Sequence, residues 1–192
     1  MPPVDWNDRW REKAEHPLRP DPWLTRVLPL LPPGRLLDVA CGRGRNALFL
    51  AEQGHAVHAI DYSAEGIGLL LAEAANRQLE ITAEHVDLEH TPALPAATFD
   101  AVIVFFYLQR TLFPALKQSV RPGGVIVVRT FSQAGSFSGS PRRTEFVLAP
   151  GELLSIFSGW EILLHEEGLE PSSKGGSLAG IVARRPATAS CA

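Results

Sequence analysis

The sequence predicts a doubly wound α/β fold, in which helices cover both faces of a mostly parallel, seven-stranded sheet. Over the first two thirds of the chain, short apolar segments of strand length alternate with helical segments, which is the pattern of a parallel sheet. Glycine and proline turns mark several of the boundaries. The last two apolar segments are joined by a charged, glycine-bearing loop, which predicts an antiparallel C-terminal edge strand. We expect a three-layer α/β/α sandwich in a single domain, residues 1–192.

The composition limits the class of protein. A chain of 192 residues with 45% hydrophobic and 20% charged residues is ordinary for one globular core. A formal net charge of −3 gives no sign of a basic nucleic-acid-binding face. Two cysteines form no disulfide framework, which favours a reducing compartment. The first ten residues carry charges and no apolar h-region, so we expect no secretory signal there, and the longest apolar run, 101–108, is too short to span a bilayer.

From these limits we expect a cytoplasmic protein, a monomer or a homodimer, that acts on a small molecule and binds neither nucleic acid nor membrane. Residues 1–20 are rich in tryptophan, charge and proline and are too polar to form a core. They are predicted to form an N-terminal arm packed by its tryptophans, or a lid over a ligand. At the other end, residues 186–192 are predicted to be a frayed tail.

The elements between these ends follow from apolar spacing and capping signals. Asp21 and Pro22 fit the N-cap and first position of a helix, which Pro29 ends or kinks. Gly54 fits the end of the next helix, and Ser63 fits the N-cap of the one after it. Helices are predicted at 22–31, 45–53, 63–76, 112–119 and 150–157, strands at 35–40, 56–60, 81–86, 99–104, 125–130, 160–165 and 178–184, a loop at 132–140 and an extended segment at 141–148.

Four of the predicted strands deliver site residues to one edge of the sheet. The turn 38–46 follows the first strand, Asp61 the second, Asp87 the third, and the segment 105–110 the fourth. Ligands of such sheets bind beyond the carboxyl ends of the strands, where these segments become neighbours. The combination predicts a nucleoside-binding site.

Each residue type suits one part of a nucleoside. Gly42 and Gly44 allow positive φ and a close approach of the backbone to the ligand. Asp61 can accept hydrogen bonds from both ribose hydroxyls. Asp87 can accept a hydrogen bond from the exocyclic amino group of an adenine, and Leu88 can lie against the adenine ring. The alternatives are a tight turn without a ligand, a helix cap at Asp61, and a solvated loop acid at Asp87.

Two classes of cofactor fit this unit. Gly42-Arg-Gly-Arg-Asn-Ala47 satisfies the relaxed dinucleotide pattern, with Asp61 about twenty residues further on, so an NAD(P)-binding Rossmann oxidoreductase is one alternative. A pyrophosphate, however, favours a neutral turn at the helix N-terminus, and Asp38 and Asp87 both add negative charge. A cationic sulfonium without phosphate tolerates these acids, which favours S-adenosylmethionine.

The stretch Leu36-Leu-Asp-Val-Ala-Cys-Gly-Arg-Gly-Arg-Asn46 resembles motif I of the class I S-adenosylmethionine-dependent methyltransferases. The spacing to Asp61, to Asp87 and to the turn before Gly124 is similar to the same family. The Cys-Gly-x-Gly-Arg-Asn form and the segment 146–162 resemble the tellurite-resistance, TehB-like branch, near the thiopurine methyltransferases. The resemblance implies a Rossmann-like fold and a methyltransferase that converts S-adenosylmethionine to S-adenosylhomocysteine.

The resemblance also implies a set of cofactor contacts. The chain departs from the family at Ala40, where the motif usually has its first glycine and where a methyl group narrows the approach to the methionine part. It departs again at Arg129, where the family often has an acid. The implied contacts are Asp38, Ala40, Gly42, Gly44, Asn46, Asp61, Tyr62, Asp87, Leu88 and Phe105, with Trp10, Trp6 and Arg11 added if the N-terminal segment closes over the site.

Methyl transfer from a sulfonium is an in-line displacement that leaves a neutral thioether, so a soft anionic acceptor needs no acid or base. Alignment supplies most of the benefit, about 7–11 kcal/mol. The run from Phe105 predicts an apolar acceptor pocket with Tyr107, Arg110 and Arg129 as candidates, Arg129 either steering an anion or pairing with a nearby acid. No residue is assigned a catalytic role and no metal is expected. We expect tellurite, selenite, a thiol or another small metabolite as acceptor; a non-catalytic S-adenosylmethionine-binding domain is the remaining alternative.

Overall fold

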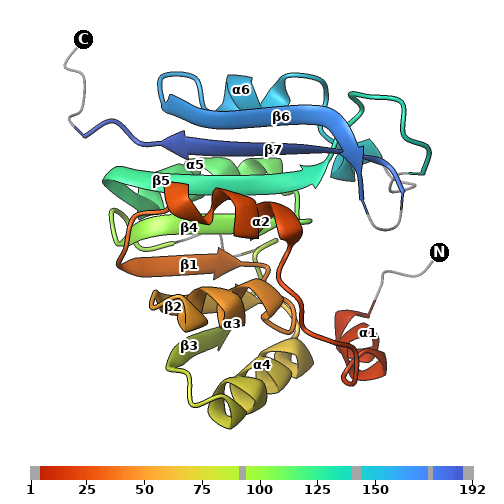
Figure 1. Cartoon of the computed structure of the whole chain (residues 1–192), viewed down its shortest axis with the longest axis vertical. Coiled ribbons are helices and arrows are strands. Elements are labelled where there is room, and N and C mark those ends of the chain that lie inside the picture. Colours follow the sequence, from red (N-terminus) through yellow and green to blue (C-terminus); the bar gives the residue numbers. More distant parts are fainter. Residues whose placement is uncertain (1–4, 91–93, 140–143, 173–174, 188–192) are drawn as a thin grey trace. The chain divides into compact units, whose positions relative to one another are not determined.

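The computed structural model describes residues 5–90, 94–139, 144–172 and 175–187 (Figure 1). The chain divides into two compact units, Met1–Pro92 and Ala93–Ala192, and the organisation as one domain stays a prediction. Of the predicted tail, residues 188–192 lie outside the described residues. In the part of the chain that the structure describes, no helix is long and apolar enough to cross a membrane.

The first unit contains a parallel three-stranded part of the sheet, in the order β3-β2-β1. β1 (Arg35–Val39) pairs in parallel with β2 (Ala56–Asp61), which pairs in parallel with β3 (Ile81–His85). All of β1 except its first residue is buried, which explains why its sequence is apolar on both faces. The helices described in this unit are α1 (Trp6–Glu12), α2 (Pro22–Val27), α3 (Arg45–Glu52) and α4 (Ala64–Asn76).

The capping signals of the sequence are confirmed where these helices begin and end. The Asp21 side chain accepts a hydrogen bond from the Trp23 amide at 3.0 Å, and α2 ends at Val27, just before the 3₁₀ turn that contains Pro29. The Ser63 hydroxyl accepts from the Gly66 amide at 3.0 Å as the N-cap of α4. These local bonds satisfy amides that a helix start leaves without intrahelical partners.

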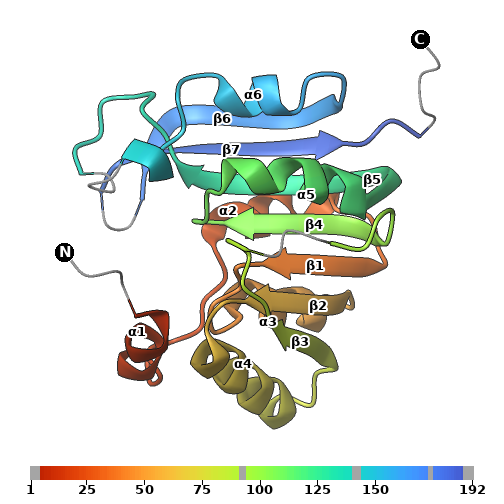
Figure 2. The ribbon, with the colours of Figure 1, turned by 180° about the vertical axis from the view of Figure 1, so that it is seen from behind.

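The second unit contains the strand order β4-β5-β7-β6 (Figure 2). β4 (Phe99–Phe105) and β5 (Val120–Phe131) are parallel, whereas β7 (Ser177–Arg184) is antiparallel to both β5 and β6 (Glu161–Pro171) and lies between them. Its helices are α5 (Phe113–Ser119) and α6 (Glu152–Ile156), with 3₁₀ turns at Arg110–Leu112 and Thr144–Phe146.

The predicted fold class is confirmed, since the two units together hold the seven predicted strands in a mixed, mostly parallel arrangement. Several boundaries differ from the predicted ones. β5 begins five residues early because Val120 already pairs with Phe99, and β6 runs on through the charged residues to Pro171, with a register shift near its end. The segment 141–148 was expected to be extended; residues 141–143 lie outside the described residues, and Thr144–Phe146 is a 3₁₀ turn, so that part of the prediction was wrong.

Candidate cofactor site

Three residues with positive φ turn the chain from β1 into α3. Gly42 has a φ of +59° and Gly44 of +77°, as the glycine pattern predicted. Ala40 has a φ of +56°, a left-handed conformation that costs a residue with a Cβ about 1–2 kcal/mol. The position where the related motif has a glycine is therefore one where the backbone of this chain favours glycine.

Asp61 holds this turn from the end of β2. Its Oδ2 accepts a hydrogen bond from the Gly42 amide at 2.7 Å, and its Oδ1 accepts from the Ser63 amide at 2.8 Å. Burial raises the pKa of Asp61, while these two backbone bonds lower it. A carboxylate has about four acceptor positions, so two bonds leave room on both oxygens. Asp61 thus supports the start of α4 and keeps the capacity to accept two ribose hydroxyls.

Asp38 is the buried acid of the site. Its side chain is 2% exposed, and among the described residues its Oδ2 has no hydrogen-bond partner. Burial raises the pKa of Asp38 to about 8, the charge of Asp61 adds to this, and Arg45 and the backbone amide of Ala47 oppose it. Buried polar atoms in folded proteins are nearly always hydrogen-bonded, so such an atom indicates a ligand. A cationic hydrogen-bond donor would satisfy Asp38 in its ionised form, which would repel a phosphate.

The Asn46 side chain makes a hydrogen bond that links two helices. Its side-chain oxygen accepts from the Asp21 amide at 2.9 Å, which joins the start of α3 to the start of α2. Arg45 lies 3.3 Å from the Asp21 carboxylate in the same cluster. A contact of Asn46 with the cofactor stays a prediction.

The residues predicted for the adenine side lie after β2 and β3. Tyr62 is 52% exposed, with its ring 6.0 Å from that of His85. Asp87 accepts from the Glu89 amide at 3.0 Å and lies 2.8 Å from His90, whose hydrogen bond lowers the pKa of Asp87. Leu88 is buried at 3% exposure. Asp87 therefore has local partners on both oxygens, and its bond to an adenine stays a prediction.

The N-terminal segment lies against the glycine turn. A Cβ placed on Gly42 would come within 2.6 Å of the Trp10 ring, and one on Gly66 within 3.0 Å of it. Trp6 stacks on Trp10 at 6.0 Å. The indole Nε1 of Trp10 is buried and has no hydrogen-bond partner among the described residues. The tryptophans thus pack the N-terminal segment against the glycine turn of the first unit, where a ligand is expected.

Sequence reasoning missed Arg43, which holds this arm. The buried Arg43 side chain donates hydrogen bonds to the backbone oxygens of Ala14 and His16. Only its position inside the glycine turn marks it in the sequence, because no pattern announces a bond to two carbonyl oxygens 27 and 29 residues away.

The candidate acceptor residues belong to the second unit. Phe105 ends β4 at 7% exposure, and Tyr107 is half-buried. Arg110 donates to both carboxylate oxygens of Glu152, at 2.6 and 2.9 Å, and to the carbonyl oxygens of Glu145 and Val147. Buried Arg129 pairs with Glu170 at 2.5 Å. Of the two roles considered for Arg129, pairing with a nearby acid is the one observed.

Comparisons with known proteins agree with this geometry. Residues 36–124 match a family model described as a methyltransferase domain. The chain is 32% identical over 143 residues to hemagglutinin 1 of Eikenella corrodens, covering 71% of this chain and 47% of that protein. It is 25% identical over 145 residues to a probable S-adenosyl-L-methionine-dependent methyltransferase TehB of Haemophilus influenzae, covering 73% of this chain and 50% of that protein.

The crystal structure of TehB from Haemophilus influenzae matches with a TM-score of 0.78 at 19% identity, over 94% of this chain and 67% of that chain. This match confirms the predicted Rossmann-like fold. The chain spans about half the length of the two curated relatives described above. In the first unit, a buried acid beside a glycine turn, with one oxygen that has no partner among the described residues, fits a nucleoside that carries positive charge better than one that carries a pyrophosphate.

Proposed function

Since the chain is a class I S-adenosylmethionine-dependent methyltransferase of the TehB-like branch, we propose that it methylates a small, soft nucleophile such as tellurite, selenite or a thiol. Its cofactor is S-adenosylmethionine, so the nicotinamide alternative is set aside. The activity of the whole protein belongs to the proposal, because the curated relatives are about twice as long as the region they share with this chain.

The observation that carries the proposal is the Oδ2 of Asp38, which has no partner in the part of the chain that the structure describes and lies next to Asp61 and the glycine turn. Asp61 accepts the ribose hydroxyls, and Gly42 and Gly44 let the backbone approach the ligand. Asp38 faces the positively charged amino-acid part. The cofactor supplies a methyl group on a sulfonium, and these residues bind and orient it.

A soft nucleophile agrees with what the second unit offers. Arg110 and Arg129, the cations predicted for an acceptor pocket, are engaged by Glu152 and Glu170. Tellurite and selenite attack as anions, and a thiol attacks as the thiolate that is present in part at neutral pH after its proton has gone to solvent, so no residue has to act as general base during the attack. Alignment alone then provides most of the rate advantage.

The test is a transfer screen with labelled S-adenosylmethionine and acceptors of three kinds. Tellurite, selenite and small thiols represent soft nucleophiles, a catechol represents oxygen acceptors, and glycine represents amine acceptors. We expect labelled product and S-adenosylhomocysteine with at least one soft nucleophile, and loss of both in Asp61→Ala. Transfer only to the catechol or to glycine would contradict the proposed acceptor class. Binding without transfer to any acceptor would favour the non-catalytic alternative.

A further inference from the structure

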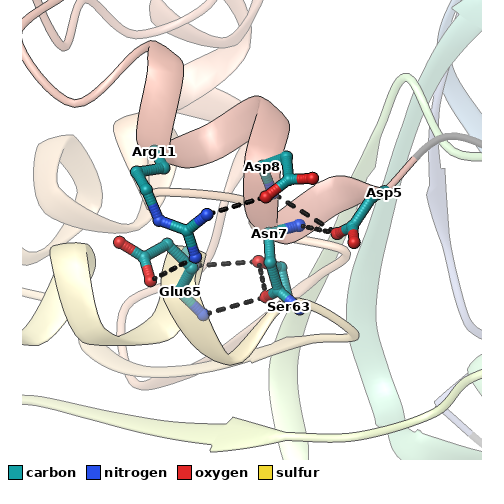
Figure 3. Close-up of polar contacts among 7 residues, drawn as sticks. Asp5, Asn7, Asp8, Arg11, Ser63 and Glu65 are labelled. Atoms are coloured by element: carbon teal, nitrogen blue, oxygen red, sulfur yellow. Dashed lines mark hydrogen bonds and ion pairs between the residues drawn. The ribbon is translucent and has the colours of Figure 1, made fainter.

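Helix α1 caps the start of helix α4 with one side chain. The Asn7 Oδ1 accepts a hydrogen bond from the Ser63 hydroxyl at 2.8 Å and another from the Glu65 amide at 3.1 Å (Figure 3). Ser63 is itself the N-cap of α4 and is fully buried. The first amides of a helix have no intrahelical acceptors, so Asn7 supplies from another helix what α4 lacks.

The same bonds continue into the cofactor site. The Ser63 amide donates to Asp61 Oδ1 at 2.8 Å, and Asp61 Oδ2 accepts from the Gly42 amide at 2.7 Å. Asn7, Ser63, Asp61 and Gly42 therefore form one chain of hydrogen bonds that runs from α1 to the glycine turn. At the glycine turn, the Trp10 ring of α1 lies against Gly42, so α1 contacts both ends of this hydrogen-bonded series.

The ion pair between α1 and α4 is weaker than these hydrogen bonds. Arg11 lies 3.5 Å from Glu65, but its side chain is 60% exposed, and exposed ion pairs contribute little. Helix α1 has no buried residue of its own. The half-buried Asn7 contact is thus the main polar contact between α1 and α4, and it acts beside the packing of Trp10 on Gly66 and the bonds that Arg43 makes just after α1.

We infer that Asn7 is a positioning residue for the cofactor: it docks α1 on α4 and thereby fixes Ser63, Asp61 and the glycine turn in the geometry that binds S-adenosylmethionine. The inference rests on the cofactor assignment and not on the identity of the acceptor. Coupling between two sites is reciprocal, so bound cofactor also stabilises the docking of α1 on α4.

The chemistry of the contact separates this role from a general loss of stability. Both bonds to Asn7 are accepted by one oxygen, so aspartate keeps them, whereas alanine removes them. A negative charge is also favourable at the start of a helix, and position 7 lies in the first turn of α1 and beside the first turn of α4. Asn7→Asp is therefore the conservative variant and Asn7→Ala the disruptive one.

The experiment compares the wild type with Asn7→Ala, Asn7→Asp and Glu12→Ala, the last being an exposed position of the same helix. Calorimetry gives the dissociation constant of S-adenosylhomocysteine, and hydrogen exchange of the Glu65 amide reports whether α1 is docked. In Asn7→Ala we expect binding about tenfold weaker, faster exchange at Glu65, and a raised KM for S-adenosylmethionine with kcat within about twofold. Asn7→Asp and Glu12→Ala should behave as the wild type does, and S-adenosylhomocysteine should slow exchange at Glu65.

Two results would overturn the inference. One is faster exchange at Glu65 in Asn7→Ala with unchanged affinity for S-adenosylhomocysteine, because α1 would then be undocked without consequence. The other is an Asn7→Asp variant that binds as weakly as Asn7→Ala, because the shared oxygen would then not be what matters. If the wild type itself bound neither S-adenosylmethionine nor S-adenosylhomocysteine, the cofactor assignment would fail instead, so the two failures are distinguishable.

Discussion

The two units treat their charged residues in opposite ways. In the first unit, the buried Asp38 keeps an oxygen without a partner among the described residues, and Asp61 uses two backbone amides and retains further acceptor capacity. In the second unit, Arg110 makes a two-point ion pair with Glu152, and Arg129 pairs with Glu170. At its glycine turn the first unit keeps acceptor capacity on two acids for a ligand, whereas the second unit uses both of its candidate arginines in contacts within the unit.

This difference between the units shows which residues indicate a binding site. Leaving a buried carboxyl without a partner costs free energy, so a folded chain retains one mainly where a ligand compensates. An arginine carries no such signal, since its contribution depends on which acid or carbonyl group lies beside it. The comparison therefore predicts large effects on binding from changes in the first unit and effects on stability alone from changes in the second.

The largest effect is expected for Asp61→Asn. The amide keeps one acceptor oxygen but turns an NH₂ group toward the Gly42 or Ser63 amide, where two donors would face each other. Hydrogen bonds to a charged group contribute about 1.5–3 kcal/mol each, so we expect affinity for S-adenosylmethionine to fall about 100-fold by calorimetry. Glu161→Gln, which neutralises an acid in an exposed pair with Arg184, is the control and should bind normally. Equal affinity in Asp61→Asn would contradict the assigned role of Asp61.

Asp38 should make cofactor binding dependent on pH. With a pKa of about 8 in the free protein, its carboxyl is mostly protonated at neutral pH, whereas a cationic ligand favours the charged form. Affinity for S-adenosylmethionine should therefore rise up to tenfold per pH unit and level off above about pH 8. Binding at pH 7 should release a proton, which appears as a binding enthalpy that varies with the ionisation enthalpy of the buffer.

The stability of the ligand-free protein should show the opposite trend. Folding raises the pKa of Asp38 from 3.8 to about 8, so the folded state holds more protons between these values than the unfolded state does. This contribution to the free energy of unfolding is fully present below the lower pKa and is lost as pH rises through the upper one. Asp38→Asn should abolish both trends, and an unchanged pH profile in that variant would assign them to another group.

A moderate effect, on stability alone, is expected for Arg110→Gln. The variant loses the pair with Glu152 and the bonds to the Glu145 and Val147 carbonyl oxygens. Because the Arg110 side chain is 43% exposed, solvent screening limits the loss to about 1 kcal/mol, measurable by denaturant unfolding. The KM for the acceptor should stay within about twofold. A rise of tenfold or more would place Arg110 in contact with the acceptor and remove the contrast between the units.

How far the sequence predicts the molecule follows the same division. The alternation of strands and helices and the caps at Asp21 and Ser63 are short-range signals, and they give the fold correctly. The glycine turn and Asp61 are also legible, because Gly42 and Gly44 require positive φ within a few residues. Contacts between distant segments are not legible, since an arginine has the same appearance in sequence whichever acid or carbonyl it meets.

Three elements illustrate this limit. The bonds of Arg43 to the N-terminal segment, of Asn7 to α4, and of Arg129 to Glu170 join residues 27 to 58 positions apart. The predicted end of β6 was wrong for a related reason. On an edge strand whose two faces are both half-exposed, the alternation of apolar and polar residues is too weak to distinguish strand from loop. The positions that sequence predicts best are thus those where backbone geometry itself restricts the residue type.

The smallest effect is expected for Ala40→Gly. Glycine relieves the strain of a φ of +56°, about 1–2 kcal/mol, but it also adds about 0.4–1 kcal/mol of freedom to the unfolded chain. The difference between these two terms predicts an increase of about 0–1.6 kcal/mol in the free energy of unfolding. Gln78→Gly is a matched control, because Gln78 has a φ of +58° and is exposed away from the glycine turn. It measures the same relief of strain and the same gain of unfolded-state entropy at a position outside the cofactor site.

Any change in S-adenosylmethionine affinity in Ala40→Gly that Gln78→Gly lacks measures how far the Ala40 methyl group narrows the approach to the cofactor. We expect less than threefold, because Asp38 and Asp61 supply the strong interactions. A tenfold gain would mean that this methyl group sets the affinity of the first unit as much as its acids do.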